Sequence, residues 1–191
     1  HSHDDLEYLI QKRERAKITD LTIDEAITNR PYQKTAIKTL VEWLNANHRR
    51  GLLVLATGTG KTVISALDYK RFRKQNPKGP NRLLFIAHRE EILDQSIHCF
   101  RNVLRDENFG DLFVGNHRPS QISHLFMSIQ TFNAQAFADK TTPEFYDYII
   151  VDEFHHAAAK SYQRLLDYYQ PKILLGLTAT PERMDGQDIL G

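Results

Sequence analysis

Residues 52–62 read Leu-Leu-Val-Leu-Ala-Thr-Gly-Thr-Gly-Lys-Thr. The apolar run predicts a strand, and the glycines predict a tight turn that a polyphosphate could approach closely. Lys61 would then begin a helix, whose N-terminus favours anions. Lys61 would then reach the β- and γ-phosphates, and Thr62 would place its hydroxyl on the bridging Mg²⁺. The stretch departs from the G-x-x-x-x-G-K-[ST] pattern at Leu55, where a glycine is expected. The competing interpretation is an ordinary turn with an exposed lysine.

Composition indicates a globular domain. The chain has 191 residues, of which 41% are hydrophobic and 26% are charged, with a formal net charge of +1. A site for a polyanion would therefore be a local patch. The single cysteine, Cys99, excludes an internal disulfide and a multi-cysteine zinc site. Because no apolar run reaches about 20 residues and no signal peptide is recognisable, we expect a cytoplasmic protein with no membrane partner.

Around this stretch, apolar runs alternate with segments of helical spacing. That alternation predicts an α/β fold with a parallel sheet covered by helices on both faces. Predicted strands cover residues 52–56, 82–87, 111–115, 124–129, 146–151 and 172–177. Predicted helices cover residues 4–15, 22–29, 30–50, 63–74, 93–104, 132–138 and 157–169.

Polar residues gather just after the predicted strands. In parallel sheets the ligand lies beyond the carboxyl ends of the strands, so we expect these segments to meet along one edge. The segments are residues 57–62, 88–90, 130–131, 152–156 and 178–180.

An acidic pair follows the strand at 146–151. Asp152 is placed to hold Mg²⁺, directly or through water, and Glu153 could orient and deprotonate an attacking water. The neighbouring His155 and His156 make a poor metal site without other spaced ligands. We expect His155 to be a hydrogen-bonding link to the next motif.

With these residues in place, residues 30–183 resemble the first RecA-like motor domain of superfamily 2 helicases and translocases of the DExH type. The motifs occur in the family's order. The resemblance implies an adenine contact from Gln33 and a phosphate loop formed by Thr57, Gly58, Thr59, Gly60, Lys61 and Thr62. It implies nucleic-acid contacts from His88, Arg89, Gln130 and Thr131, catalytic roles for Lys61, Asp152, Glu153 and His155, and coupling of hydrolysis to domain movement by Thr178 and Thr180.

Within the superfamily, the motifs look most like those of the motor subunits of type I and type III restriction enzymes and related bacterial DExH proteins. That likeness implies Mg-ATP as cofactor and DNA rather than RNA as partner. We expect a charged helical leader over residues 1–29, with residues 1–3 foreign to the fold, and a RecA-like domain over residues 30–191. The second RecA-like domain, with its arginine fingers, would lie elsewhere in the parent protein, so this chain alone would hydrolyse ATP poorly.

Two other functions stay open. A nucleotide-gated nucleic-acid clamp would switch on ATP binding alone, although a water-orienting Glu153 argues against it. An RNA remodeller of the same superfamily is the other. A nuclease finds no support, because Mg-ATP already accounts for the acidic pair.

Overall fold

The computed structural model describes residues 50–54, 60–157 and 159–178. In this part of the chain six strands form one sheet in the order β1-β6-β5-β2-β4-β3, and every neighbouring pair is parallel. The strands are β1 (Arg50–Val54), β2 (Leu83–Ala87), β3 (Asp111–Phe113), β4 (His124–Ser128), β5 (Tyr148–Val151) and β6 (Ile173–Thr178). The predicted parallel α/β fold is confirmed.

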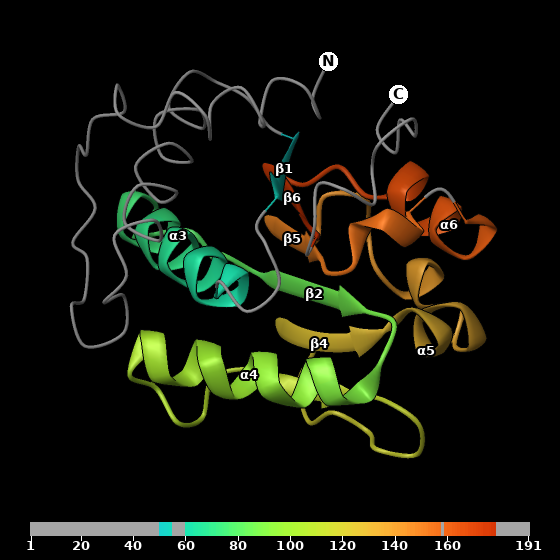
Figure 1. The fold of residues 1–191 in the computed structure, drawn as a ribbon, viewed down its shortest axis with the longest axis horizontal. Coiled ribbons are helices and arrows are strands. Elements are labelled where there is room, and N and C mark those ends of the chain that lie inside the picture. The colour runs from blue at the N-terminus through green and yellow to red at the C-terminus, as the bar shows by residue number, and fades with distance from the viewer. Residues whose placement is uncertain (1–49, 55–59, 158, 179–191) are drawn as a thin grey trace.

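Helices join the strands and cover the sheet. The helices are α3 (Lys61–Gln75), α4 (Glu90–Leu104), α5 (Ile129–Ala134) and α6 (Lys160–Tyr168), with 3₁₀ turns η2 (Phe137–Lys140) and η3 (Phe154–His156). Helices α3 and α4 pack together on one side of the strands, whereas α5 and α6 lie on the other side, towards the carboxyl ends of β2 and β4 (Figure 1).

Strands β2, β5 and β6 are buried along their whole length, as expected for strands covered on both faces. On the α4 side, the rings of Phe85, Phe100 and Phe126 all contact one another, with centroids 5.3 to 5.8 Å apart. A second aromatic cluster joins α5, η2 and the strand β5 region to the end of α6. Its members are Phe132, Phe137, Tyr146 and Tyr169.

The core also contains an ion pair on α3. Asp68 and Arg71 are 0% and 3% exposed, and Arg71 Nε donates to Asp68 Oδ1 at 3.0 Å. The Tyr148 hydroxyl, from β5, donates to the other carboxylate oxygen at 2.6 Å. Because both carboxylate oxygens are satisfied, the pair is tolerated in a dry environment and fixes α3 to the sheet.

The helix predicted over residues 132–138 is wrong in position. Helix α5 begins at Ile129, because the Ser128 hydroxyl caps it by accepting a hydrogen bond from Thr131 N at 3.1 Å. Ala136, with φ of 48°, then separates α5 from the 3₁₀ turn η2. Similarly, the extended backbone of Ala159 (ψ 149°) delays α6 to Lys160, after the 3₁₀ turn η3.

Several predictions lie outside the described residues: the three N-terminal helices, Gln33, residues 57–59 of the phosphate loop and Thr180. Within the part of the chain that the structure describes, none of the helices is long and apolar enough to cross a membrane.

Candidate functional site

The carboxyl ends of the strands bring the predicted segments to one edge of the sheet. Val151 is in register with Ile86 of β2 and with Gly176 of β6, and Ala87 is in register with Ser128 of β4. The residues that follow, from His88, Ile129 and Asp152 onwards, therefore leave the sheet at one level. For the described segments the predicted convergence is confirmed.

Lys61 and Asp152 meet at this edge. Gly60 has φ of 79°, a left-handed conformation that favours glycine, and helix α3 begins at the next residue. Lys61 Nζ lies 3.5 Å from Asp152 Oδ1, with the Asp152 side chain 1% exposed and that of Lys61 24% exposed. A cation at a helix N-terminus and a buried carboxylate facing it suit a phosphate chain together with its divalent metal ion.

The environment of Asp152 raises its pKa. Burial is the largest cause, and the Glu153 carboxylate acts in the same direction, whereas Lys61 and a hydrogen bond from the Glu153 N–H oppose them. That bond is 2.7 Å long and ends on Asp152 Oδ1. The negative charge of this buried carboxylate is only partly balanced by its neighbours. Divalent cations such as Mg²⁺ prefer oxygen ligands, so the carboxylate suits such a cation.

Glu153 takes a strained backbone conformation. Its φ of 53° is in the left-handed region, and the residue stands at the N-terminus of η3. Among the described residues its carboxylate accepts one hydrogen bond, from Arg89 Nη2 to Oε2 at 3.1 Å. The other oxygen, Oε1, is buried and has no hydrogen-bond partner among the described residues.

Two more buried hydroxyls lack a partner within the described residues, those of Tyr162 on α6 and Thr178 at the end of β6. Burial raises the pKa of Tyr162 to about 12, and the charges of Glu153 and Asp152 add to this, which places Tyr162 near the acidic pair. Unpaired buried polar atoms are uncommon in folded proteins and often mark functional sites.

Gly176 makes room for the acidic segment. A Cβ atom on Gly176 would lie 2.6 Å from Cγ of Phe154, the residue after Glu153. The missing side chain on β6 thus lets η3 lie against the sheet, where it sets the position of the Asp152-Glu153 turn.

A separate cleft of about 360 Å³ lies beyond β2 and β4. The residues that line it include His88, Glu90, Gly115, Gln130, Thr131 and Gln135. Gln130 Nε2 lies 3.4 Å from His88 Nδ1, and the His88 ring lies 5.5 Å from that of His156. The structure therefore brings His88, Gln130 and Thr131 together. Thr131 is only 8% exposed, and its hydroxyl accepts a hydrogen bond from Ser128 at 2.9 Å.

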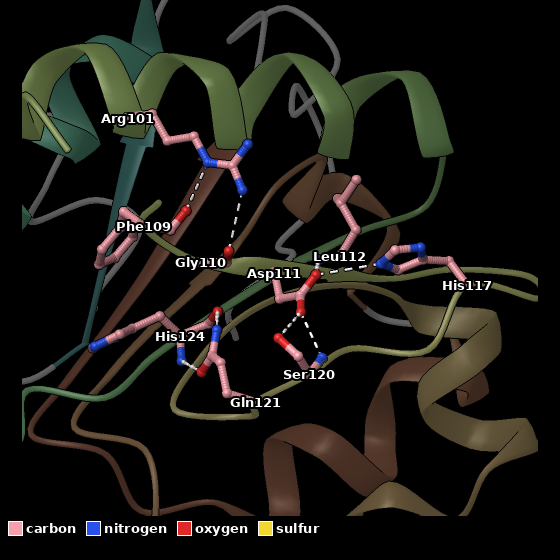
Figure 2. Close-up of polar contacts among 9 residues, drawn as sticks. All are labelled: Arg101, Phe109, Gly110, Asp111, Leu112, His117, Ser120, Gln121 and His124. Carbon is pink, nitrogen blue, oxygen red and sulfur yellow. Dashed lines mark hydrogen bonds and ion pairs between the residues drawn. The ribbon is translucent and has the colours of Figure 1, made fainter. Parts of the chain in front are cut away.

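The loop that carries Gly115 is braced by Asp111 of β3. Asp111 Oδ2 accepts hydrogen bonds from the Ser120 N–H at 2.6 Å and hydroxyl at 3.0 Å, while Oδ1 accepts from Leu112 N at 2.9 Å and lies 3.3 Å from His117 Nε2 (Figure 2). Burial opposes ionisation, but these bonds together hold the pKa of Asp111 below its ordinary value. The loop is thus tied back to the edge strand.

Helix α4 is tied to the same edge strand. Arg101 donates from Nε to the Phe109 carbonyl at 2.8 Å and from Nη2 to the Gly110 carbonyl at 3.2 Å (Figure 2). These bonds fix the start of β3 against α4, and with it one wall of the cleft.

Sequence reasoning missed the Arg89–Glu153 pair, the fit of Phe154 against Gly176 and the buried Tyr162. Partners 64 residues apart leave no local signal in the chain. Gly176 could have been noticed, because a glycine inside an apolar strand often marks a close approach.

The described parallel sheet, with a lysine-bearing helix start opposite a buried aspartate, is the architecture of a RecA-like nucleotide-binding domain. The family and the relatives given next make it the first such domain of superfamily 2 helicases. The chain belongs to the family described as type III restriction enzyme, res subunit, whose family model matches residues 26–183.

Known proteins agree with this assignment. The chain is 32% identical over 162 residues to the type I restriction enzyme EcoAI endonuclease subunit of Escherichia coli, covering 80% of this chain and 19% of that protein. It is 28% identical over 165 residues to the DNA 3'-5' translocase XPB2 of Sulfurisphaera tokodaii, covering 86% of this chain and 34% of that protein. The structure of the Pyrococcus furiosus Hef helicase domain matches with a TM-score of 0.64 and 23% identity, over 86% of this chain and 37% of that one.

The chain thus spans about a fifth to a third of the lengths of these two sequence relatives. Its family makes it a RecA-like motor domain of the helicase type.

Proposed function

We propose that this chain is the ATP-binding half of a motor that couples Mg-ATP hydrolysis to movement along DNA. The ATP would bind between this domain and a second RecA-like domain of the full-length protein. DNA is preferred to RNA as the partner because the names of the two sequence relatives are those of a restriction enzyme subunit and a DNA translocase.

The observation that carries the proposal is the approach of Lys61 Nζ to the buried Asp152 carboxylate, at 3.5 Å. Mg²⁺ is usually held by one or two carboxylates together with substrate phosphates, and a lysine beside it neutralises phosphate charge. Thr62 and Asp152 would hold Mg²⁺, which would supply positive charge to stabilise the charge that develops on the phosphate chain.

In this proposal each described residue has one role. Lys61 binds the β- and γ-phosphates, Thr62 and Asp152 hold Mg²⁺, and Glu153 orients the attacking water. Thr178, whose buried hydroxyl has no partner among the described residues, is available to form a new hydrogen bond when the phosphate chain changes. His88, Gln130 and Thr131 would face the nucleic-acid backbone.

The remaining parts of the proposal rest on the sequence. Gln33, residues 57–59, His155 and Thr180 keep their predicted roles at the adenine, the phosphates and the coupling motif. The division into a leader over residues 1–29 and a RecA-like domain over residues 30–191 is part of the proposal, as is a cytoplasmic location.

The test is steady-state ATP hydrolysis by the full-length protein, without nucleic acid and with duplex DNA, single-stranded DNA or RNA. Stimulation by duplex DNA would support a translocase. Preference for RNA would favour a remodeller, and tight ATP binding without stimulated turnover would favour the clamp.

Two variants separate the roles of the ATP site. Lys61→Ala should weaken ATP binding about 10- to 100-fold, as expected for a lost charge-assisted hydrogen bond. Glu153→Gln should leave ATP binding nearly unchanged and lower kcat by about 10²- to 10⁴-fold. Lys172→Ala, which removes a lysine 54% exposed beside Asp147, is the matched control. Equal loss of ATP binding in the Lys61 and Glu153 variants would contradict these roles.

A further inference from the structure

Arg89 touches the carboxylate that is assigned to hydrolysis. It follows β2 and occupies the N-cap position of α4, with extended backbone (φ −113°, ψ 141°). Its side chain is 61% exposed, and its Nη2 donates to Glu153 Oε2 at 3.1 Å. A residue placed by sequence at the nucleic-acid side thus reaches the nucleotide side.

The Arg89 bond is the hydrogen bond that holds the Glu153 side chain within the described part of the chain. The Glu153 backbone is fixed separately, because its N–H donates to Asp152 Oδ1 at 2.7 Å. The Glu153 side chain is 15% exposed, and its buried Oε1 has no partner among the described residues. Loss of the Arg89 bond would therefore free the carboxylate without moving the backbone that carries it.

The neighbours of Arg89 in the chain face the cleft. His88 and Glu90 both line it, and Gln130 Nε2 lies 3.4 Å from His88 Nδ1. None of the described lining residues is lysine or arginine. At the turn between β2 and α4, the cation within reach of a nucleic-acid phosphate in this cleft would be Arg89. Its side chain is mostly exposed to solvent.

We infer that Arg89 is a positioning residue that links the two sites: without nucleic acid it holds the Glu153 carboxylate, and a nucleic-acid phosphate in the cleft draws the guanidinium away. While Arg89 holds Oε2, the Glu153 carboxylate is fixed in one orientation and cannot turn toward the attacking water. Release of Arg89 therefore makes Glu153 available for hydrolysis. This inference rests on the proposed function.

The strength of the pair suits an exchangeable contact. A pair whose arginine is mostly exposed and which has a single hydrogen bond favours the held state by about two- to fivefold. A phosphate can accept two parallel hydrogen bonds from a guanidinium, which makes it a stronger partner than a carboxylate held through one hydrogen bond. Nucleic acid can therefore displace Glu153 from Arg89.

The experiment measures ATP hydrolysis by the full-length protein at saturating ATP, without nucleic acid and with saturating duplex or single-stranded DNA. Arg89→Gln should raise the nucleic-acid-free kcat about two- to fivefold, leave KM for ATP unchanged and lower the ratio of stimulation by the same factor. Arg89→Lys, which keeps the charge, should change less. Arg164→Gln is the matched control, since Arg164 is also exposed (56%) and paired with a carboxylate, that of Asp139.

Other outcomes overturn the inference. An unchanged nucleic-acid-free kcat with a higher DNA concentration for half-maximal stimulation would make Arg89 a phosphate contact only. A parallel fall of basal and stimulated kcat would mean that Arg89 supports Glu153 rather than restrains it. Absence of stimulation in the wild-type protein would instead refute the proposed function itself, before any variant is considered.

Discussion

Replacing Gly176 with alanine should push the acidic turn out of place. The added Cβ would lie 2.6, 2.7 and 3.1 Å from the Cγ, Cδ1 and Cδ2 atoms of the Phe154 ring. Ordinary contact begins at 3.4 Å, so ring and strand must separate by about 0.8 Å. Phe154 is 5% exposed and β6 is buried throughout, so neither has free space into which to move.

The expected cost combines two effects of opposite sign. Overpacking a buried site costs about 1–3 kcal/mol, while replacing a strand glycine by alanine regains about 0.5–1 kcal/mol. The net destabilisation should be about 0.5–2 kcal/mol, or a fall in Tm of about 1–8 °C for a domain of this size. Because Phe154 follows Glu153 directly, kcat for ATP should fall as well.

Thermal and urea unfolding followed by circular dichroism would measure the cost. Gly79→Ala is the control, since its Cβ would meet its nearest atom, Asn81 Oδ1, at 3.4 Å. Phe154→Leu should relieve the clash, so the double variant Gly176→Ala/Phe154→Leu should be more stable than the sum of the single effects by about 1 kcal/mol. Effects that add to within about 0.5 kcal/mol would refute the steric reasoning.

Two further predictions concern buried charge. Asp68→Ala should lower the free energy of unfolding by about 3–5 kcal/mol, because it leaves the buried Arg71, 3% exposed, without its carboxylate. Urea unfolding measures this loss, and a value below about 1 kcal/mol would contradict the prediction. Burial, then the charges of Arg73 and Arg82, lower the pKa of His124 from 6.5 to about 4. Between these two values the unfolded chain binds a proton on His124 that the folded chain does not. The free energy of unfolding should therefore fall by about 1–2 kcal/mol, allowing for the partial exposure of His124, as pH drops from 6.5 to 4. Urea midpoints over this pH range should show a smaller fall in His124→Phe, and an equal fall would mean that other groups cause it.

Much of the site could be predicted because its parts follow general rules. Apolar runs alternating with helical spacing predict parallel strands, and parallel strands bring their carboxyl ends to one edge. The sequence alone therefore predicts that Lys61 and Asp152 lie at the same edge of the sheet. Each lies directly after a strand or at a helix start, where the chain direction alone fixes its level in the sheet.

What could not be predicted depends on contacts between distant segments. The order of the strands decides that Arg89, after β2, stands beside Glu153, after the neighbouring β5. Glu153 has a left-handed backbone, a conformation that glutamate normally avoids. Its residue type therefore gives no signal of this conformation in the sequence. Ser128 caps α5 at the end of an apolar run that by itself predicts only a strand. The sequence pattern therefore predicts a helix start that is too late.

The pairing of β1 with β6 has a consequence for how the protein is made. In the described part of the chain β1 pairs with β6 alone, so Val54, just before the phosphate loop, is in register with Thr178. A contact between such distant residues forms late, because a long loop must close first. A ribosome synthesises β1 long before β6, and the nascent chain can complete its nucleotide site only after Thr178 has emerged. Nucleotide binding by chains stalled at successive lengths would therefore report when the sheet closes.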